Sequence, residues 1–339
     1  MSTELSCIVS SRNINIEPLI KLLSKISDNI VILDTSDDDF VKNVQRLSKK
    51  YKNVKVVHTL GLGHPEPFIP YLTKKCKHDW IFRLDGDEMP NKNIIRDVNK
   101  ILDNAKEEGI AAYNILRKNE FWDHNILYDR VIRLYNKKYG FYTGVLHETP
   151  IIKGSVKTLG DKYLIYHYPF KYSKGKGKRE RNYAPLMFYE YRLNFNILIE
   201  ETSRRIRSKY IIKAIDKLVR LYLAILGKSQ NEEFSKLEYL IIFFFDTLRA
   251  GITNRSFFEF KMKLLGIKGL VDKLFAFPPE ERREQMEISM KIRKYGGVTR
   301  FLGLDNEKVI KEINRKYKNK LEGAALLIEL LKNKNKVTR

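Results

Sequence analysis

The sequence predicts an α/β fold, with a mostly parallel sheet covered by helices on both faces, followed by an all-helical C-terminal region. Three observations lead to this expectation. Short apolar runs alternate with segments of helical spacing early in the chain, one of these runs stops abruptly at a cluster of carboxylates, and helical spacing dominates the second half. We therefore expect two domains, residues 1–185 around the sheet and residues 186–339 built from helices.

The first three strands are predicted from short runs rich in β-branched residues. Residues 5–10 and 29–33 are such runs, and residues 54–57 form a third. The two segments between them carry apolar residues at helical spacing, the first of them after Pro18. Strand, helix, strand, helix and strand in this order indicate parallel strands joined by right-handed crossovers.

A fourth strand, residues 80–84, leads directly into Asp85, Gly86, Asp87 and Glu88. Open α/β sheets bind ligands at the carboxyl ends of their strands, and two aspartates around one glycine can hold a hard cation that neutralises a diphosphate. A polar turn is the alternative, because the same spacing occurs elsewhere in the chain without a strand before it. No glycine-rich phosphate loop follows the first strand, which argues against a dinucleotide-binding fold and a P-loop kinase.

The basic charge of the chain is concentrated in its second half. Residues 1–170 contain 26 Lys and Arg against 21 Asp and Glu, a net charge of +5, whereas residues 171–339 contain 38 against 20, a net charge of +18. This asymmetry indicates an anionic partner, and nucleic acid, an anionic membrane surface and a phosphorylated substrate all satisfy it. A lysine-rich surface without such a partner is the alternative.

The two cysteines, Cys7 and Cys76, stand at no spacing typical of a disulfide framework or a zinc site. The first ten residues also lack the basic and apolar regions of a secretory signal. We therefore expect a cytoplasmic protein, with a peripheral position on the inner face of the membrane as one option for the helical region.

Several short motifs follow one another in a characteristic order between residues 4 and 185. They are Asp34 with its acidic turn, residues 84–88, the Arg-Leu-aromatic run at residues 130–135, Gly-Val-Leu-His-Glu at residues 144–148, and His167 followed by a basic segment. This order is similar to that of family-2-type glycosyltransferases with the Rossmann-like GT-A fold, and in particular to the branch that includes the lipopolysaccharide-core β-glucosyltransferases. The resemblance is specific through its order rather than through any single motif.

The resemblance implies a donor site for a nucleotide sugar, with UDP- and GDP-linked sugars as the expected donors. Asp34 would contact the base or ribose, although the same residue could cap a helix or a turn. Asp85 and Asp87 would meet the ribose and a divalent cation that bridges the diphosphate. His167 would be a second cation ligand beside Asp87, unless it is a buried, hydrogen-bonded histidine. The expected cofactor is Mg²⁺ or Mn²⁺, and a histidine ligand favours Mn²⁺.

For an inverting transfer, one carboxylate must take the proton of the acceptor hydroxyl. Glu148 is the expected base, because the glycine of its motif lets the chain approach a ligand closely; capping of a turn or pairing with an arginine is the alternative. His147 would orient this base or contact the sugar. Asp123 and Asp129 are the runner-up candidates for the base. Trp122 would stack on the acceptor sugar unless it belongs to the core.

Residues 171–181 are the most basic window of the chain and include two glycines. Lys178 and Arg181 in this window could fold over the diphosphate and stabilise the charge on the leaving nucleotide. A solvated linker between domains is the alternative.

The second half of the chain, residues 186–339, is expected to be all-helical. Residues 211–226 show the pattern of a basic amphipathic helix, and the apolar run at residues 239–245 is far too short to cross a membrane. This region could dock on an anionic membrane that presents a lipid-linked acceptor, or form an ordinary helical bundle or an oligomer interface.

The sequence thus predicts a metal-dependent, inverting glycosyltransferase that moves a sugar from a nucleotide sugar to a hydroxyl of a glycan, lipid-linked or protein-linked acceptor. A sugar nucleotidyltransferase is one rival, although residues 10–13 are not the glycine-rich, basic loop that this class needs. A basic nucleic-acid-binding protein is the less favoured rival, and duplex binding at physiological salt would support it.

Overall fold

The computed structural model describes residues 4–120, 126–144, 148–168, 294–321 and 323–337, with a few further positions between 284 and 292. The chain divides into two compact units, the first formed by Met1–Tyr189 with Met290–Arg339 and the second by Glu190–Ser289. Nearly all of the described residues belong to the first unit.

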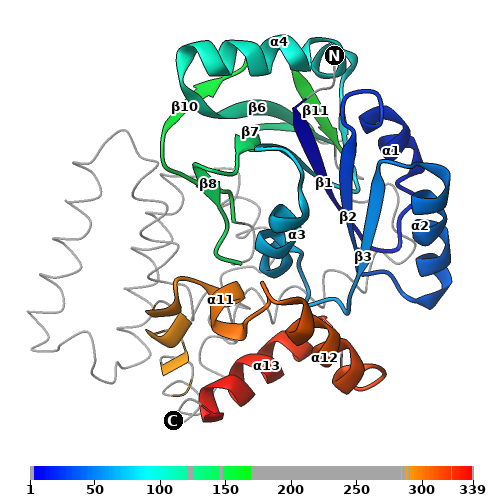
Figure 1. The fold of residues 1–339 in the computed structure, drawn as a ribbon, viewed down its shortest axis with the longest axis vertical. Helices are drawn as coiled ribbons and strands as arrows, with labels where there is room; N and C mark the ends of the chain where they lie inside the picture. Colours follow the sequence, from blue (N-terminus) through cyan, green and yellow to red (C-terminus); the bar gives the residue numbers. More distant parts are fainter. Residues whose placement is uncertain are drawn as a thin grey trace, which may run out of the picture. The chain divides into compact units, whose positions relative to one another are not determined.

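Four parallel strands form the first half of a nine-stranded sheet, in the order β3-β2-β1-β4. Figure 1 shows β3, β2 and β1 of this order side by side. Their bounds are β1 Leu5–Ser11, β2 Asn29–Asp34, β3 Val54–His58 and β4 Trp80–Asp85. The connecting helices are α1 Glu17–Leu23, α2 Asp38–Lys50 and α3 Ile69–Lys75, the last preceded by the 3₁₀ turn η1 Glu66–Phe68. The predicted order of strands and helices is confirmed.

The second half of the sheet is mixed. Its strands are β5 Glu88–Pro90, β6 Ile110–Glu120, β7 Ile126–Asn136, β10 Ser155–Thr158 and β11 Leu164–His167. β7 runs antiparallel to β4 and β6, β11 runs parallel to β6, and β5 pairs antiparallel with β11. β8 Gly140–Phe141 and β9 Ile151–Ile152 form a separate two-stranded sheet.

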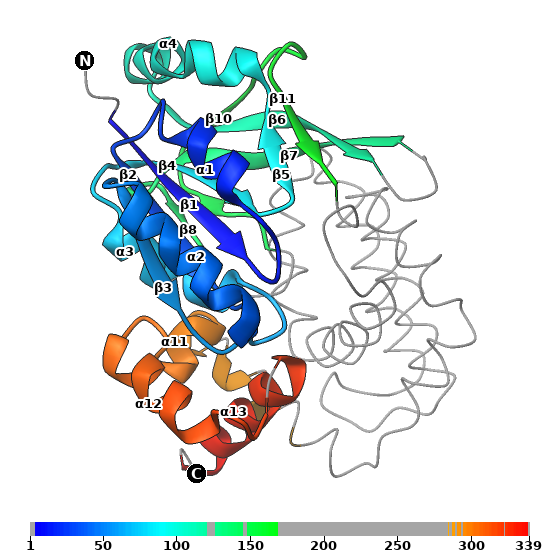
Figure 2. The same cartoon turned by 90° about the vertical axis from the view of Figure 1, so that its right-hand side faces the viewer.

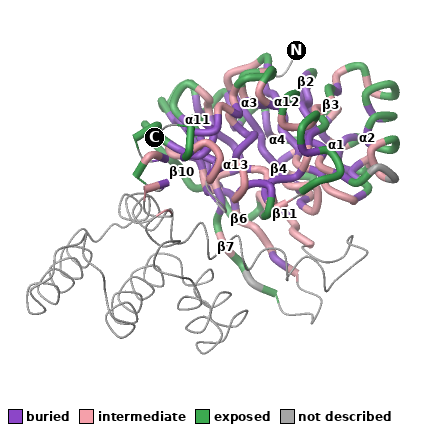
Figure 3. Tube along the Cα trace, turned by 90° about the horizontal axis from the view of Figure 1, so that it is seen from below, coloured by how far each residue is buried: buried purple, intermediate pink, exposed green. Residues whose placement is uncertain are grey.

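Helices cover both faces of the sheet, as Figure 2 shows for α1 and α2 on one side and α3 on the other. On β1, the alternate residues Leu5, Cys7 and Val9 belong to the main apolar core, together with buried side chains of α1, α2 and α4 Lys92–Glu108. In Figure 3 the buried residues gather in the central strands, and exposed residues lie along the outer helices. The predicted α/β class, with a mostly parallel sheet and helices on both faces, is confirmed.

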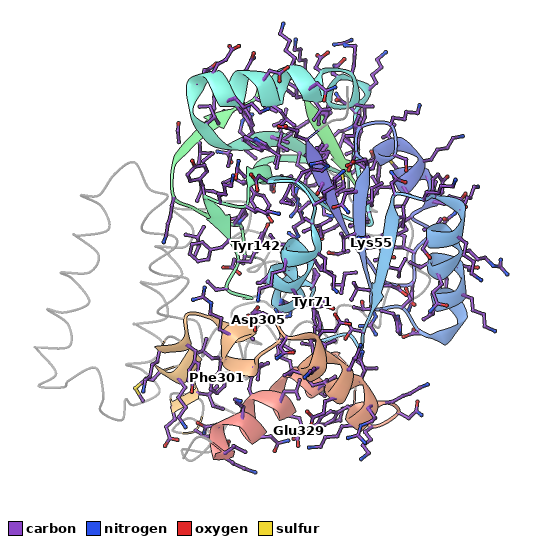
Figure 4. All side chains as sticks on the ribbon, viewed as in Figure 1. Lys55, Tyr71, Tyr142, Phe301, Asp305 and Glu329 are labelled. Carbon is purple, nitrogen blue, oxygen red and sulfur yellow. The ribbon has the colours of Figure 1, made fainter. Side chains whose placement is uncertain are left out.

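Three C-terminal helices pack on loops of the sheet unit: α11 Val298–Leu302, α12 Glu307–Tyr317 and α13 Gly323–Val337. Thr299 donates from its backbone N to Thr143 O (3.1 Å) and from Oγ1 to Pro67 O (2.8 Å). Asn314 Oδ1 accepts from Thr59 Oγ1 at 2.9 Å. Figure 4 labels Tyr71 of α3 and Asp305, which precedes α12, at this junction, where Lys74 Nζ lies 2.8 Å from Asp305 Oδ2.

The helical character of the chain's end is therefore confirmed for the described residues. These last helices share a compact unit with the sheet. The expected amphipathic helix at residues 211–226 and the apolar run at residues 239–245 lie outside the described residues. A domain boundary at residue 185 stays a prediction. Across the ranges that the structure describes, every helix is too short or too polar to cross a membrane.

Replacement of Gly297 by alanine is expected to lower the free energy of unfolding by about 2–4 kcal/mol. Gly297 has φ +126°, and a Cβ there would lie 2.4 Å from Thr143 O, so alanine would be both strained and overpacked. Chemical denaturation would measure the loss. The control is Gly160→Ala, since a Cβ at Gly160 has open space around it; equal stability of the two variants would contradict the expectation.

Candidate functional site

The carboxylate turn lies where the strand order reverses. β1 has β2 on one side and β4 on the other, and the crevice at the carboxyl ends of such strands is the usual ligand site of an open α/β sheet. Ser10 near the end of β1 pairs with Asp85 at the end of β4, and the N–H of Gly86 donates to Ser10 O at 2.7 Å. The turn is thus fixed to the sheet at the predicted ligand edge.

Two buried arginines hold the carboxylate of Asp85. Arg83 Nη2 lies 3.1 Å from Asp85 Oδ1, and Arg133 Nη2 lies 2.7 Å from Asp85 Oδ2. Although burial alone would raise the pKa of Asp85, Arg83 and Arg133 lower it below its ordinary value. Arg83 also pairs with Glu66 of η1 at 3.2 Å. Asp85 is therefore an ionised member of a buried ion-pair network, and its donor role stays a prediction.

Glu88 closes the same turn from inside the protein. Its Oε2 accepts the N–H of Asp85 at 3.1 Å, while Oε1 accepts from Arg133 Nη2 at 2.6 Å and from Arg117 Nη1 at 2.9 Å. The side chain is fully buried. Burial would raise the pKa of Glu88, but Arg133 and Arg117 hold it far below its ordinary value. Glu88, which the sequence analysis treated only as part of the turn, is its internal anchor.

Acidification is expected to destabilise the fold through this turn. The folded-state pKa values of Asp85 and Glu88 lie below their ordinary values, so their stabilising contribution is complete above about pH 4.5 and is lost as the pH falls through the folded-state values. Urea unfolding between pH 7 and pH 3 measures this loss. The free energy of unfolding should fall less steeply with decreasing pH in Glu88→Gln, which has no carboxyl group to protonate at this position. An equal pH dependence in the wild type and in Glu88→Gln would contradict the expectation.

His167 faces Asp87 across the edge of the sheet. The Nε2 atom of His167, at the end of β11, lies 3.7 Å from Asp87 Oδ1, and each side chain is 19% exposed. The backbone N of Tyr168 donates to Asp87 O at 3.0 Å, which ties the end of β11 to the turn. Burial, and then the nearby Arg117, lower the pKa of His167 to about 4. The imidazole is therefore neutral at pH 7 and able to bind a metal ion.

This pair fits an open cation site. Within the described ranges no group of three or more His, Cys, Asp or Glu side chains is placed to hold a metal, so a closed site made only of protein ligands is absent there. Mg²⁺ and similar ions in nucleotide sites are commonly held by one or two protein ligands, with water and substrate phosphates completing the shell. Asp87 and His167 supply one oxygen and one nitrogen toward the same space.

Asp34 lies inside the protein at the end of β2. Its side chain is fully buried, Oδ1 accepts from Ser36 N at 3.1 Å, and Oδ2 lies 3.0 Å from Nδ1 of His58. The turn role that the sequence left open is thus present, and contact with a donor stays a prediction. The side chain of His58 is 36% exposed. His58 could not be identified from the sequence as a partner of Asp34, because only the pairing of β2 with β3 places the two residues side by side.

Glu148 caps a turn. Both of its carboxylate oxygens accept from the N–H of Thr143, and Oε2 also accepts from the N–H of Gly144, all at 2.8 Å. Glu148 is buried. Tyr142, which precedes this turn and is labelled in Figure 4, has its ring centroid 5.4 Å from Cζ of Arg83. The capping alternative is therefore present in the structure, while the role of Glu148 as a base stays a prediction.

The remaining predicted site residues divide into two groups. Asp129 is described: Arg117 donates to both of its oxygens, at 3.0 and 2.6 Å, which makes it an ion-pair partner. The others lie outside the described residues, so their roles stay predictions; they are Trp122, Asp123, His147, Lys178 and Arg181.

Comparison with known proteins gives matches of low identity. No protein-family model matches the sequence. A protein of Rickettsia bellii (strain RML369-C) named uncharacterized glycosyltransferase is 23% identical over 190 residues, which cover 50% of this chain and 60% of the relative. One of Rickettsia felis (strain ATCC VR-1525 / URRWXCal2) with the same name is 26% identical over 163 residues, covering 44% of this chain and 56% of the relative.

Solved structures with some likeness include S. aureus TarS. The structure of TarS residues 1–349 has a TM-score of 0.44 and 14% identity, over 100% of this chain and 91% of that one. The structure of the same residues in complex with UDP has a TM-score of 0.44 and 15% identity, with the same coverage. These scores are too low to establish a shared fold. By sequence, about half of this chain is similar to proteins named glycosyltransferases, and the match spans about 60% or less of their length.

Proposed function

We propose that the protein is a metal-dependent glycosyltransferase of the GT-A type, which transfers a sugar from a UDP- or GDP-linked donor to a hydroxyl group with inversion. The observation that carries the proposal is the pair formed by Asp87 and His167, whose Oδ1 and Nε2 atoms face each other at 3.7 Å. It lies at the edge of the sheet where open α/β folds bind ligands. The similarity to proteins named glycosyltransferases supports the same activity.

Each residue of the site has a part in this reaction. Asp87 and His167 would hold the cation. Asp85, whose side chain is 29% exposed, would contact the donor ribose while the two arginines keep it ionised. A bound Mg²⁺ or Mn²⁺ would offset the charge of the diphosphate and of the departing nucleotide. Outside the described residues, Lys178 and Arg181 would add positive charge at the same place.

The acceptor side of the reaction requires a base. Glu148 or Asp123 would take the proton of the acceptor hydroxyl. Glu148 is buried and accepts the N–H groups of Thr143 and Gly144, so its carboxylate would have to become accessible to the acceptor before it could act as the base. The acceptor would be a glycan, lipid-linked or protein-linked molecule that offers a hydroxyl group, and the basic helical region could lie near an anionic membrane.

A panel of nucleotide sugars tests the proposal. UDP-, GDP-, dTDP- and CMP-linked sugars are each added with Mn²⁺, Mg²⁺ or a chelator, and the readouts are the melting temperature and the release of free nucleotide. At 100 times its Kd, a donor that binds only the folded protein adds about 2.7 kcal/mol of stability. Donors that carry one particular nucleotide base should raise the melting temperature of the protein, and only when the metal is present. If no donor binds with any metal while DNA duplexes bind at physiological salt, the proposal fails, and the result favours a basic nucleic-acid-binding protein instead.

A further inference from the structure

Asn119 fixes which nitrogen of His167 faces Asp87. A neutral imidazole carries hydrogen on one ring nitrogen and a lone pair on the other. His167 Nδ1 lies 2.7 Å from Asn119 Oδ1, and this amide oxygen can only accept a hydrogen bond, so Nδ1 carries the hydrogen. The lone pair is then on Nε2, the atom that lies 3.7 Å from Asp87 Oδ1. Two electron-rich atoms that face each other in this way favour a cation between them.

The amide of Asn119 is itself oriented by Asp129. Asn119 Nδ2 donates to Asp129 Oδ1 at 3.1 Å, and a flipped amide would place its oxygen against that carboxylate. Arg117 holds Asp129 with two hydrogen bonds, from Nε at 3.0 Å and from Nη2 at 2.6 Å. Strand pairing supports the arrangement, because Arg117 pairs with Asp129 across β6 and β7, and Asn119 pairs with His167 across β6 and β11.

Arg117 also connects Asp129 and Asn119 to the turn that carries Asp87. Its Nη1 donates to Glu88 Oε1 at 2.9 Å, and Glu88 directly follows Asp87 in the chain. A continuous series of side chains therefore links the two sides of the cation site. In order, it consists of Glu88, Arg117, Asp129, Asn119 and His167.

We propose that Asn119, Asp129 and Arg117 form a positioning relay, which presents Nε2 of His167 as a nitrogen ligand to a divalent cation shared with Asp87. The inference rests on the proposed function, because it concerns the cation of that site. Hydrogen-bond partners of this kind fix the tautomer and ring orientation of metal-binding histidines. A nitrogen ligand also favours Mn²⁺ over Mg²⁺, so the relay shifts the preference of the site from Mg²⁺ toward Mn²⁺.

Replacement of Asn119 by leucine tests the relay through metal affinity. Mn²⁺ binding is followed by electron paramagnetic resonance of the free ion, and Mg²⁺ binding by competition. Asn119→Leu should weaken Mn²⁺ binding about 10- to 100-fold and reduce the preference for Mn²⁺ over Mg²⁺. The matched control is Asn114→Leu, the same substitution on the same strand, which should leave both affinities unchanged. Equal Mn²⁺ affinity in Asn119→Leu and the wild type would overturn the relay.

A second measurement uses the wild-type protein and does not depend on how the variant folds. Ring ¹⁵N chemical shifts distinguish the two tautomers, and the signal of His167 is assigned by its loss in His167→Gln. The relay predicts hydrogen on Nδ1; hydrogen on Nε2 in the wild type would overturn it. Neither measurement needs a sugar donor. Relay-dependent Mn²⁺ binding in a protein that turns over no nucleotide sugar would support the relay and contradict the glycosyltransferase proposal.

Discussion

Replacement of Arg133 by alanine is expected to lower the free energy of unfolding by about 3–5 kcal/mol, because it removes one arginine partner from each of two carboxylates, one of them fully buried. Arg133 is 6% exposed. Its guanidinium holds both Asp85 and Glu88, and these two carboxylates form the ends of the turn that carries Asp87. In this variant the remaining arginine partner of Glu88 would be Arg117, and that of Asp85 would be Arg83.

Arg130→Ala is the matched control for this variant. Arg130 is on the same strand, β7, and pairs with Asp161, but both side chains are at least a third exposed. Exposed pairs contribute at most about 1 kcal/mol, so this variant should remain close to the wild type. Denaturant unfolding of the two variants measures the difference. If both lost the same stability, the turn would not depend on the buried network.

Replacement of Asp87 by asparagine is expected to reduce kcat/KM for donor turnover by at least about 100-fold, which corresponds to about 2.7 kcal/mol of transition-state stabilisation. Asparagine keeps the size of the side chain but removes the negative charge that would hold the proposed cation. The change should appear in the presence of Mn²⁺ or Mg²⁺, with little effect on the residual rate in chelator.

Asp97→Asn controls for the loss of an aspartate elsewhere. Asp97 lies on α4, and its side chain is 18% exposed, close to the 19% of Asp87. Nucleotide release, measured in parallel for both variants, should fall only in Asp87→Asn. Full metal-dependent turnover in Asp87→Asn would exclude Asp87 as the cation ligand.

The sequence predicted the first four strands well, because each is a short run of apolar residues whose signal is local. The same local signal placed Asp85 and Asp87 at the carboxyl end of a strand, where β4 indeed ends. Pairing between distant strands has no local signal, so the position of β7 between β4 and β6 could not be anticipated.

The site was harder to predict because its partners come from distant parts of the chain. Arg83 lies within the apolar run of β4, and nothing nearby in the sequence shows that it pairs with Glu66 and Asp85. Asn119 meets His167 only because β11 lies beside β6. For Glu148, the sequence indicated a functional carboxylate and left the turn-capping role open; the backbone bonds to Thr143 and Gly144 depend on a local conformation that the sequence did not determine.

The most direct test of the account is whether a cation binds between Asp87 and His167. Mn²⁺ is added with UDP to protein labelled with ¹⁵N-histidine, and pulsed electron paramagnetic resonance detects nitrogen nuclei in contact with the ion. The account predicts coupling to one imidazole nitrogen, which disappears in His167→Gln. Tightly bound Mn²⁺ without any histidine coupling in the wild-type protein would contradict it.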